Sequence, residues 1–371
     1  DFTSETLSIL AGNGDGTFQA RASLEIGGTT QSLALKDFNG DGQLDLITGD
    51  ITANTVSVFF GNGDGSFKSR ISFATGSSPV SIALGDFNLD GTLDIATADF
   101  ALSAVGILLA NGTTIAATRG TNAGETPVDV QLLDANRDGN LDIVTANKTT
   151  NTVSIQLGNG EGSFKALASY ATGVSPSAVA FSDVNNDGKL DLVVSNQGGD
   201  NAAVLLGNGD GSFKIVTTEI LSDLGEERPW FFDPVTFGDG TFKAPLTNPG
   251  TGLSGDLQFL DINNDGKLDI LNASTSSGTL EVYIGNGDGS FKAAISNFDM
   301  AGAFSQQFGD INNDGKLDAV GSGGAFNLVL LSLGNGDGTF GAADISNGTG
   351  AANFDISLVD INRDGNLDIV S

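Results

Sequence analysis

The residues best suited to chemistry in this chain are the carboxylates of a nine-residue pattern, Asp-x-Asn-x-Asp-Gly-x-Leu-Asp, that occurs seven times. The copies span residues 37–45, 86–94, 134–142, 183–191, 261–269, 310–318 and 360–368. Each copy places three carboxylates and one amide oxygen in a short loop, and oxygen-rich loops of this kind bind hard divalent cations, above all Ca²⁺. Without a cation the three carboxylates would repel one another. The pattern therefore predicts up to seven Ca²⁺ sites.

The charge of the chain is consistent with this prediction. There are 46 acidic and 16 basic residues, a formal charge of −30, and the seven copies hold three acids each. Seven bound Ca²⁺ ions would reduce that charge to about −16. The acidic excess argues against nucleic acid as a partner and against anionic membrane surfaces. No apolar run approaches membrane-spanning length, so we expect no direct membrane insertion.

The residue types needed for common catalytic mechanisms are missing or scattered. The chain has no Cys and no His, which removes thiol chemistry and the commonest general base. Acids outside the loops and turns, such as Asp50, Asp99, Glu125, Asp129 and Asp200, show no spacing that singles out a glycosidase pair. We predict that the protein is not an enzyme.

The spacing of the pattern indicates a repeat architecture. Its first Asp recurs at steps of 49, 48, 49, 78, 49 and 50 residues. A turn sequence, Gly-Asn-Gly-Asp-Gly-Ser/Thr-Phe, occurs at 12–18, 61–67, 207–213, 285–291 and 334–340, with a variant at 158–164 and a degenerate copy near 111–113. Asn-Gly and Asp-Gly close hairpins. Four short β-type runs per repeat, for example 33–35, 44–48, 56–60 and 67–73, are typical of a propeller blade.

The two ends of the chain supply the halves of one further repeat. Residues 7–18 read as the second half of a blade, and residues 356–370 read as the first half. Joining them would remove free sheet edges. We predict an all-β fold that forms a single domain over residues 1–371. It is a seven-bladed β-propeller with four antiparallel strands per blade, whose last blade is closed by N- and C-terminal strands.

These motifs resemble the FG-GAP/VCBS repeat family, whose best-known members are the calcium-binding β-propellers of integrin α-subunits. The resemblance covers essentially the whole chain, although integrin propellers carry calcium loops in only some blades. It implies that the loops lie on one face and that partners often bind the other. It also implies Ca²⁺ ligation by the side chains at positions one, three, five and nine and by the carbonyl at position seven: Asp37, Asn39, Asp41, Gln43, Asp45, Asp86, Asn88, Asp90, Thr92, Asp94, Asp134, Asn136, Asp138, Asn140, Asp142, Asp183, Asn185, Asp187, Lys189, Asp191, Asp261, Asn263, Asp265, Lys267, Asp269, Asp310, Asn312, Asp314, Lys316, Asp318, Asp360, Asn362, Asp364, Asn366 and Asp368.

The step of 78 residues contains an insertion, which we place at residues 214–242 between the third and fourth strands of the fourth complete blade. It holds the only Trp of the chain, Trp230, near Arg228, Phe231 and Phe232. Aromatic residues and Arg in a long loop are typical of binding sites. The same residues could instead pack a hairpin extension against the blade, and both interpretations remain open.

The sequence favours a binding module over a catalyst. Ca²⁺ loops of this kind fill at the millimolar concentrations found outside cells, so we expect a secreted or cell-surface protein. Because the chain starts with Asp and shows no basic and apolar leader, we expect a mature or excised form. The expected function is adhesion or recognition of a protein or glycan ligand. The first alternative is a lectin that uses loops such as 74–79, 146–152 and 171–176. The second, which the sequence favours least, is a polysaccharide-active enzyme.

Overall fold

The repeats fold as four-stranded antiparallel sheets. The structure, a computed structural model, describes residues 5–183, 187–198, 201–217, 235–237, 240–242, 257–273, 279–286, 292, 295–299, 303–323, 328–342, 344–346 and 356–371. Within these residues every regular element is a β-strand, and none is a helix that could cross a membrane. The predictions of an all-β fold and of four-stranded antiparallel units are confirmed.

Seven four-stranded sheets are found in the described part of the chain. The first three contain β3–β6 (Thr30–Lys36, Asp45–Asp50, Thr55–Phe59, Ile71–Ala74), β7–β10 (Pro79–Gly85, Asp94–Asp99, Ala104–Ala110, Ile115–Asn122) and β11–β14 (Pro127–Leu133, Asp142–Asn147, Thr152–Gln156, Ala168–Ala171). The next three contain β15–β18 (Pro176–Ser182, Asp191–Asn196, Asn201–Gly207, Phe213–Thr217), β21–β24 (Leu257–Leu260, Asp269–Ala273, Thr279–Tyr283, Ile295–Asp299) and β25–β28 (Ala303–Gly309, Asp318–Gly323, Leu328–Ser332, Asp344–Ser346). The seventh contains β29, β30, β1 and β2 (Ser357–Val359, Asp368–Val370, Thr6–Leu10, Ala22–Glu25).

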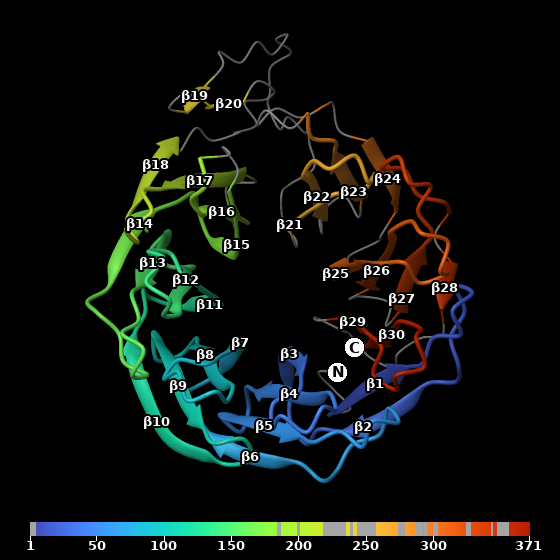
Figure 1. The fold of residues 1–371 in the computed structure, drawn as a ribbon, viewed down its shortest axis with the longest axis horizontal. Helices are drawn as coiled ribbons and strands as arrows, with labels where there is room; N and C mark the ends of the chain where they lie inside the picture. Colours follow the sequence, from blue (N-terminus) through green and yellow to red (C-terminus); the bar gives the residue numbers. More distant parts are fainter. Residues whose placement is uncertain are drawn as a thin grey trace.

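The sheets follow one another around a ring, as Figure 1 shows. The first strand of each sheet lies nearest the centre of the ring, and the fourth strand lies at its outer rim (Figure 1). The second strands β4, β8, β12 and β16 are buried along their whole length, whereas the fourth strands β6 and β14 are largely exposed. This gradient explains why apolar residues stand next to each other in the second strands, such as Leu46 and Ile47 in β4, rather than alternating with polar residues.

The hydrophobic core lies between neighbouring sheets. Ile47 and Val58 of one sheet, for example, pack with Ile95 and Leu108 of the next. Burial of such side chains on the faces of adjacent sheets holds each repeat against its neighbours, as in other repeat architectures.

Strands from the two ends of the chain share the seventh sheet. Strand β1 pairs antiparallel with β30, with Ile9 opposite Val370 and Leu10 opposite Ile369. Leu10 and Ile369 are fully buried in the same core cluster. Strands β1 and β30 accordingly lie side by side in Figure 1.

Two details differ from the sequence predictions. The fourth strand of the first complete sheet begins at Ile71 rather than at Phe67, because Phe67 instead forms an isolated bridge with Gly61 across the turn. The insertion was predicted to start at Lys214 and to lie between the third and fourth strands, and this prediction is wrong. Residues Phe213–Thr217 form β18 and pair with β17, starting with Gly207 opposite Phe213, so the extra residues follow the fourth strand.

Only a short part of the predicted insertion is described. Strands β19 (Val235–Phe237) and β20 (Gly240–Phe242) pair with each other as a two-stranded antiparallel sheet. The proposed ligand-binding residues Arg228, Trp230, Phe231 and Phe232 lie outside the described residues.

Candidate functional site

The repeated acidic pattern forms the connection between the first and second strands of each sheet. The 134–142 copy leaves β11 after Leu133 and enters β12 at Asp142, so the ninth residue of the pattern is the first residue of the second strand. The same position starts the other second strands, at Asp45, Asp94, Asp191, Asp269, Asp318 and Asp368. The sheet therefore takes up the ninth carboxylate and leaves the middle of the pattern at the surface.

The first and third residues of the pattern direct oxygen atoms at one backbone amide. The Asp138 N–H donates to Asp134 Oδ1 at 3.0 Å and to Asn136 Oδ1 at 2.9 Å. This pair of bonds recurs in the loops 86–94, 261–269, 310–318 and 360–368. Because both oxygens lie within hydrogen-bond distance of one N–H, a carboxylate and an amide oxygen converge in these loops. Asn185, the third residue of the 183–191 loop, lies outside the described residues.

The fifth residue of the pattern is held by the backbone of the seventh. Asp138 Oδ1 accepts a hydrogen bond from the Asn140 N–H at 2.9 Å. The equivalent bond is present in all seven loops, at 2.8–3.0 Å. This bond is the main reason that the pKa of Asp138 lies below its usual value, and the Gln43 N–H does the same for Asp41. The carboxylates of Asp41 and Asp138 are therefore ionised at neutral pH and carry charge that a cation could neutralise.

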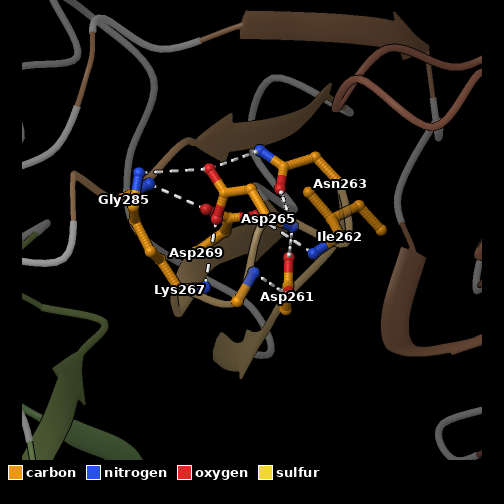
Figure 2. Close-up of polar contacts among 8 residues, drawn as sticks. Asp261, Ile262, Asn263, Asp265, Lys267, Asp269 and Gly285 are labelled. Atoms are coloured by element: carbon orange, nitrogen blue, oxygen red, sulfur yellow. Dashed lines mark hydrogen bonds and ion pairs between the residues drawn. The ribbon is translucent and has the colours of Figure 1, made fainter.

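The ninth carboxylate ties the acidic loop to a second loop of the same sheet. Figure 2 shows Asp269, whose Oδ1 accepts from the Gly285 N–H at 2.7 Å and whose Oδ2 accepts from the Ile262 N–H at 3.0 Å. The Oδ1 bond, from the residue that opens the turn after the third strand, occurs in all seven sheets at 2.7–2.9 Å. We call this contact the carboxylate staple. Its sign in the sequence is the constant separation of 16 residues between the ninth residue of the acidic pattern and the residue that opens the turn, which holds in the six sheets formed by consecutive strands.

Burial changes the proton affinity of the staple carboxylates. Asp142 is fully buried, and desolvation raises its pKa to about 6 despite the bonds from Gly158 and Ala135. Desolvation also raises the pKa of the equivalent residues Asp45, Asp94, Asp269, Asp318 and Asp368. Each staple therefore places a carboxylate where a nearby positive charge would favour its ionised form.

The oxygen atoms of the loops fit a hard cation. Asp37 Oδ1 is buried and accepts no hydrogen bond, although its counterparts in other loops accept one from the fifth residue. Such an orphaned carboxylate oxygen is a natural ligand for a cation. Among the described residues no three Asp or Glu side chains gather as a preformed metal-binding group. The converging atoms are instead a mixture of carboxylate and amide oxygens, and Ca²⁺ ligation by them stays a prediction.

In three of the loops a lysine ammonium group lies beside a carboxylate of the same loop. The ammonium groups of the seventh residues lie near the Oδ2 atoms of the fifth residues: Lys189 and Asp187 at 3.0 Å, Lys267 and Asp265 at 3.5 Å, Lys316 and Asp314 at 3.4 Å. From the sequence, the seventh residue was expected to supply only a backbone carbonyl. A Lys two residues after an exposed Asp was the available sign of this pairing.

Another polar position, at the opposite end of the second strand, was not predicted as part of a repeated feature. Asp50, Asp99, Asn147 and Asn196 end β4, β8, β12 and β16, and all four are buried. Asp99 accepts a hydrogen bond from Thr97 Oγ1 at 2.9 Å, and desolvation raises its pKa to about 6. An Asp or Asn five residues after the ninth residue of the pattern was the overlooked sign.

Solved structures with the same fold belong to proteins of different activities. An Agrocybe aegerita lectin that recognises non-reducing terminal N-acetylglucosamine aligns with a TM-score of 0.57 and 18% identity, covering 99% of this chain and 94% of the lectin. The periplasmic gluconolactonase of Pseudomonas aeruginosa aligns with a TM-score of 0.60 and 14% identity, covering 93% and 97%. A virginiamycin B lyase from Staphylococcus aureus aligns with a TM-score of 0.51 and 11% identity, covering 98% of each chain. These likenesses describe the fold alone.

Sequence comparison identifies the repeat itself. No curated protein matches the chain significantly. The FG-GAP-like repeat matches it six times, over residues 2–48, 37–97, 134–194, 183–242, 261–321 and 310–371. These matches include all seven acidic loops and cover well over half of the chain, so the protein belongs to the FG-GAP-like repeat family.

Proposed function

We propose that the protein is an extracellular, Ca²⁺-stabilised β-propeller that binds a protein or glycan ligand and has no enzymatic activity. The observation that carries this proposal is the sevenfold acidic loop with its carboxylate staple. A loop that concentrates charge, and that is tied each time to the turn of the same sheet, is suited to a structural metal site. The same arrangement offers no recurrent nucleophile or base.

We infer that the sheets are the blades of a closed, seven-bladed ring formed by one domain. Seven four-stranded sheets in the described residues support this inference, as does their circular order in Figure 1. The pairing of β1 with β30 gives the ring a seam rather than two free edges.

The side chains at positions one, three, five and nine and the carbonyl at position seven would hold the Ca²⁺ ions. Bound Ca²⁺ would neutralise two of the three carboxylate charges of each loop. A ligand that binds the folded loops but not the unfolded chain stabilises the fold by mass action, so calcium would act on stability. Asp37 Oδ1, buried without a hydrogen-bond donor, supports a cation at the first loop most directly.

The ligand would bind at the end of the sheets opposite the acidic loops. There Asn54 Oδ1 accepts from the Ser78 N–H at 2.9 Å, and Asn151 Oδ1 accepts from the Ser175 N–H at 2.8 Å. Each bond joins a loop of one sheet to the segment that leads into the next sheet. These surfaces are rich in hydroxyl and amide groups, which suits a glycan, and the fold-level likeness to a lectin favours a lectin as the second candidate. A polysaccharide-active enzyme is the third.

Metal stoichiometry and thermal unfolding test this proposal together. We expect about seven Ca²⁺ per chain by elemental analysis, and a melting temperature at least about 10 °C lower in chelator than in millimolar Ca²⁺. A glycan array then separates the ligand classes, since binding to a defined sugar favours the lectin. No bound metal and no shift in melting temperature would overturn the calcium proposal, and turnover on a polysaccharide panel would overturn the assignment as a non-enzyme.

A further inference from the structure

We propose that the seven loops form two classes of Ca²⁺ site, in which lysine at the seventh position makes the loops 183–191, 261–269 and 310–318 the weaker class. The inference rests on the proposed Ca²⁺ binding and concerns how the chain's own residues tune it. The other four loops carry Gln43, Thr92, Asn140 or Asn366 at that position and form the tighter class. Two of them contain an arginine at the fourth position, Arg137 or Arg363, but among the described residues only the three lysines form an ion pair with a carboxylate of their own loop.

The lysine ammonium groups lie against an oxygen atom of the proposed site. Lys189 Nζ lies 3.0 Å from Asp187 Oδ2, and Lys267 and Lys316 make the same pairing with Asp265 and Asp314. The fifth residue of each loop is a proposed Ca²⁺ ligand. A Ca²⁺ ion entering these loops would therefore meet a positive charge already paired with one of its ligands (Figure 2 shows the 261–269 loop).

The loops without lysine use a neutral partner for the same oxygen atom. The side-chain amide of the third residue donates to Oδ2 of the fifth: Asn39 to Asp41 at 3.0 Å, Asn88 to Asp90 at 2.9 Å, Asn136 to Asp138 at 2.9 Å and Asn362 to Asp364 at 3.1 Å. In the 261–269 loop the corresponding distance, from Asn263 to Asp265, is 3.4 Å. In this loop Asp265 Oδ2 is therefore shared between the Lys267 ammonium group and the Asn263 amide, whereas in the loops without lysine the amide is its partner.

A glycine of the neighbouring turn fixes where the seventh side chain lies. A Cβ atom on Gly209 would lie 3.0 Å from Lys189 Cδ, and one on Gly336 would lie 3.2 Å from Lys316 Cδ. The lysine stems therefore run across these glycines, which directs the ammonium groups to the loops. In the other class the same place holds an uncharged amide oxygen, as for Asn140 beside Gly160.

The expected difference in affinity is moderate, because the lysines are partly exposed and water and salt screen their charge. Repulsion between a unit charge and a divalent ion at about 5 Å in water, screened by salt at physiological ionic strength, corresponds to roughly a three- to tenfold loss of affinity. The three lysine loops belong to the consecutive sheets β15–β18, β21–β24 and β25–β28. Limiting Ca²⁺ would therefore load the sheets from β29 through β14 first.

A Ca²⁺ titration against a chromophoric chelator tests the inference on the whole chain. The wild type should show four tighter and three weaker sites. The triple variant Lys189→Gln, Lys267→Gln and Lys316→Gln should show a single class of seven. The reciprocal change Asn140→Lys should move one site to the weaker class. As a matched control, Lys148→Gln removes a charge from an exposed lysine in the connection after β12 and should leave both classes unchanged.

The outcomes separate this inference from the proposal beneath it. Seven equivalent sites in the wild type would overturn the two-class inference while leaving Ca²⁺ binding intact. Three weak sites that persist in the triple variant would overturn it equally, because the lysines would then not be their cause. Absence of any Ca²⁺ binding would remove the proposed function and this inference with it.

Discussion

Asp368 Oδ1 accepts a hydrogen bond from the backbone N–H of Gly12 at 2.7 Å, and this bond joins the last acidic loop to the first turn of the chain. The equivalent bond between Asp142 and Gly158 spans 16 residues, whereas this one spans 356. It lies beside the pairing of β1 with β30. The same local chemistry therefore serves a different purpose at the seam, where it holds together the two ends of the chain.

The seam should be more sensitive to loss of its staple than any other sheet. Asp368→Ala leaves the buried N–H groups of Gly12 and Ile361 without an acceptor, and we expect it to lower the free energy of unfolding by about 2–4 kcal/mol. Asp142→Ala should cost less, because the residues it joins stay close along the chain. Urea unfolding in chelator measures both without a metal contribution, and equal losses would contradict a special role for the seam.

Removing one fifth-position ligand should remove one metal ion. We expect Asp41→Ala to lower the Ca²⁺ count from about seven to about six while the protein still folds, because the other loops are separate. The exposed Asp64, which bonds to Ser66 in a turn, provides a control of the same residue type. Asp64→Ala should keep the full count, and an unchanged count in Asp41→Ala would disprove the ligand assignment. Elemental analysis after gel filtration gives both numbers.

The buried carboxylate of Asp99 should make stability depend on pH in a defined direction. Desolvation raises its pKa in the folded state to about 6, above the value near 3.9 of an unfolded chain. The folded state therefore binds the proton more tightly, and the resulting stabilisation is full below about pH 4 and is lost as the pH rises through 6. Relative to Asp99→Asn, the wild type should lose about 1–3 kcal/mol between pH 4 and 7. Denaturant unfolding in chelator between pH 4 and 7 measures the free energy of unfolding of both proteins. If the two free energies changed in parallel with pH, the prediction would be wrong.

The first glycine of the turn should tolerate no side chain. A Cβ atom on Gly61 would lie 2.1 Å from the carbonyl oxygen of Leu44, so Gly61→Ala must displace the loop or the turn and strain the staple to Asp45. In the second sheet the equivalent donor is Ala110, which opens a turn of different sequence. We expect a loss of about 2–4 kcal/mol in thermal or urea unfolding. Gly120→Ala is the matched control, because a Cβ atom there meets nothing within 4 Å. Similar stability of the two variants would show that the loop yields without cost.

The sequence predicted the acidic loops and their strands well because both depend on residue type. Carboxylates at fixed spacing and short apolar runs between Gly-rich turns placed the loop between the first and second strands, as found for β11 and β12. The staple could not be predicted in the same way. Its donor is a backbone N–H, which every residue but proline carries, so glycine at position 285 permits the close approach to Leu268 but does not identify Asp269 as the acceptor.

Strand boundaries and surface ion pairs were missed for other physical reasons. A turn such as 61–67 determines where the chain reverses but not where the next strand begins. In the first complete sheet the fourth strand begins at Ile71, after the turn, whereas in the fourth it begins at Phe213, the last residue of the equivalent turn. The side chain of Lys189, which contacts Asp187, runs beside Gly209 of the following turn, and this neighbour lies outside the acidic pattern.

The shared seventh sheet also sets an order of events during synthesis. The ribosome makes β1 at the start of these residues, but its partner β30 appears only at their end. The intervening sheets pair only strands that are close in the chain, so each can form as soon as it emerges. The N-terminal hairpin therefore keeps one edge unpaired until β30 has been made, so this sheet is completed after the other six four-stranded sheets of the described residues.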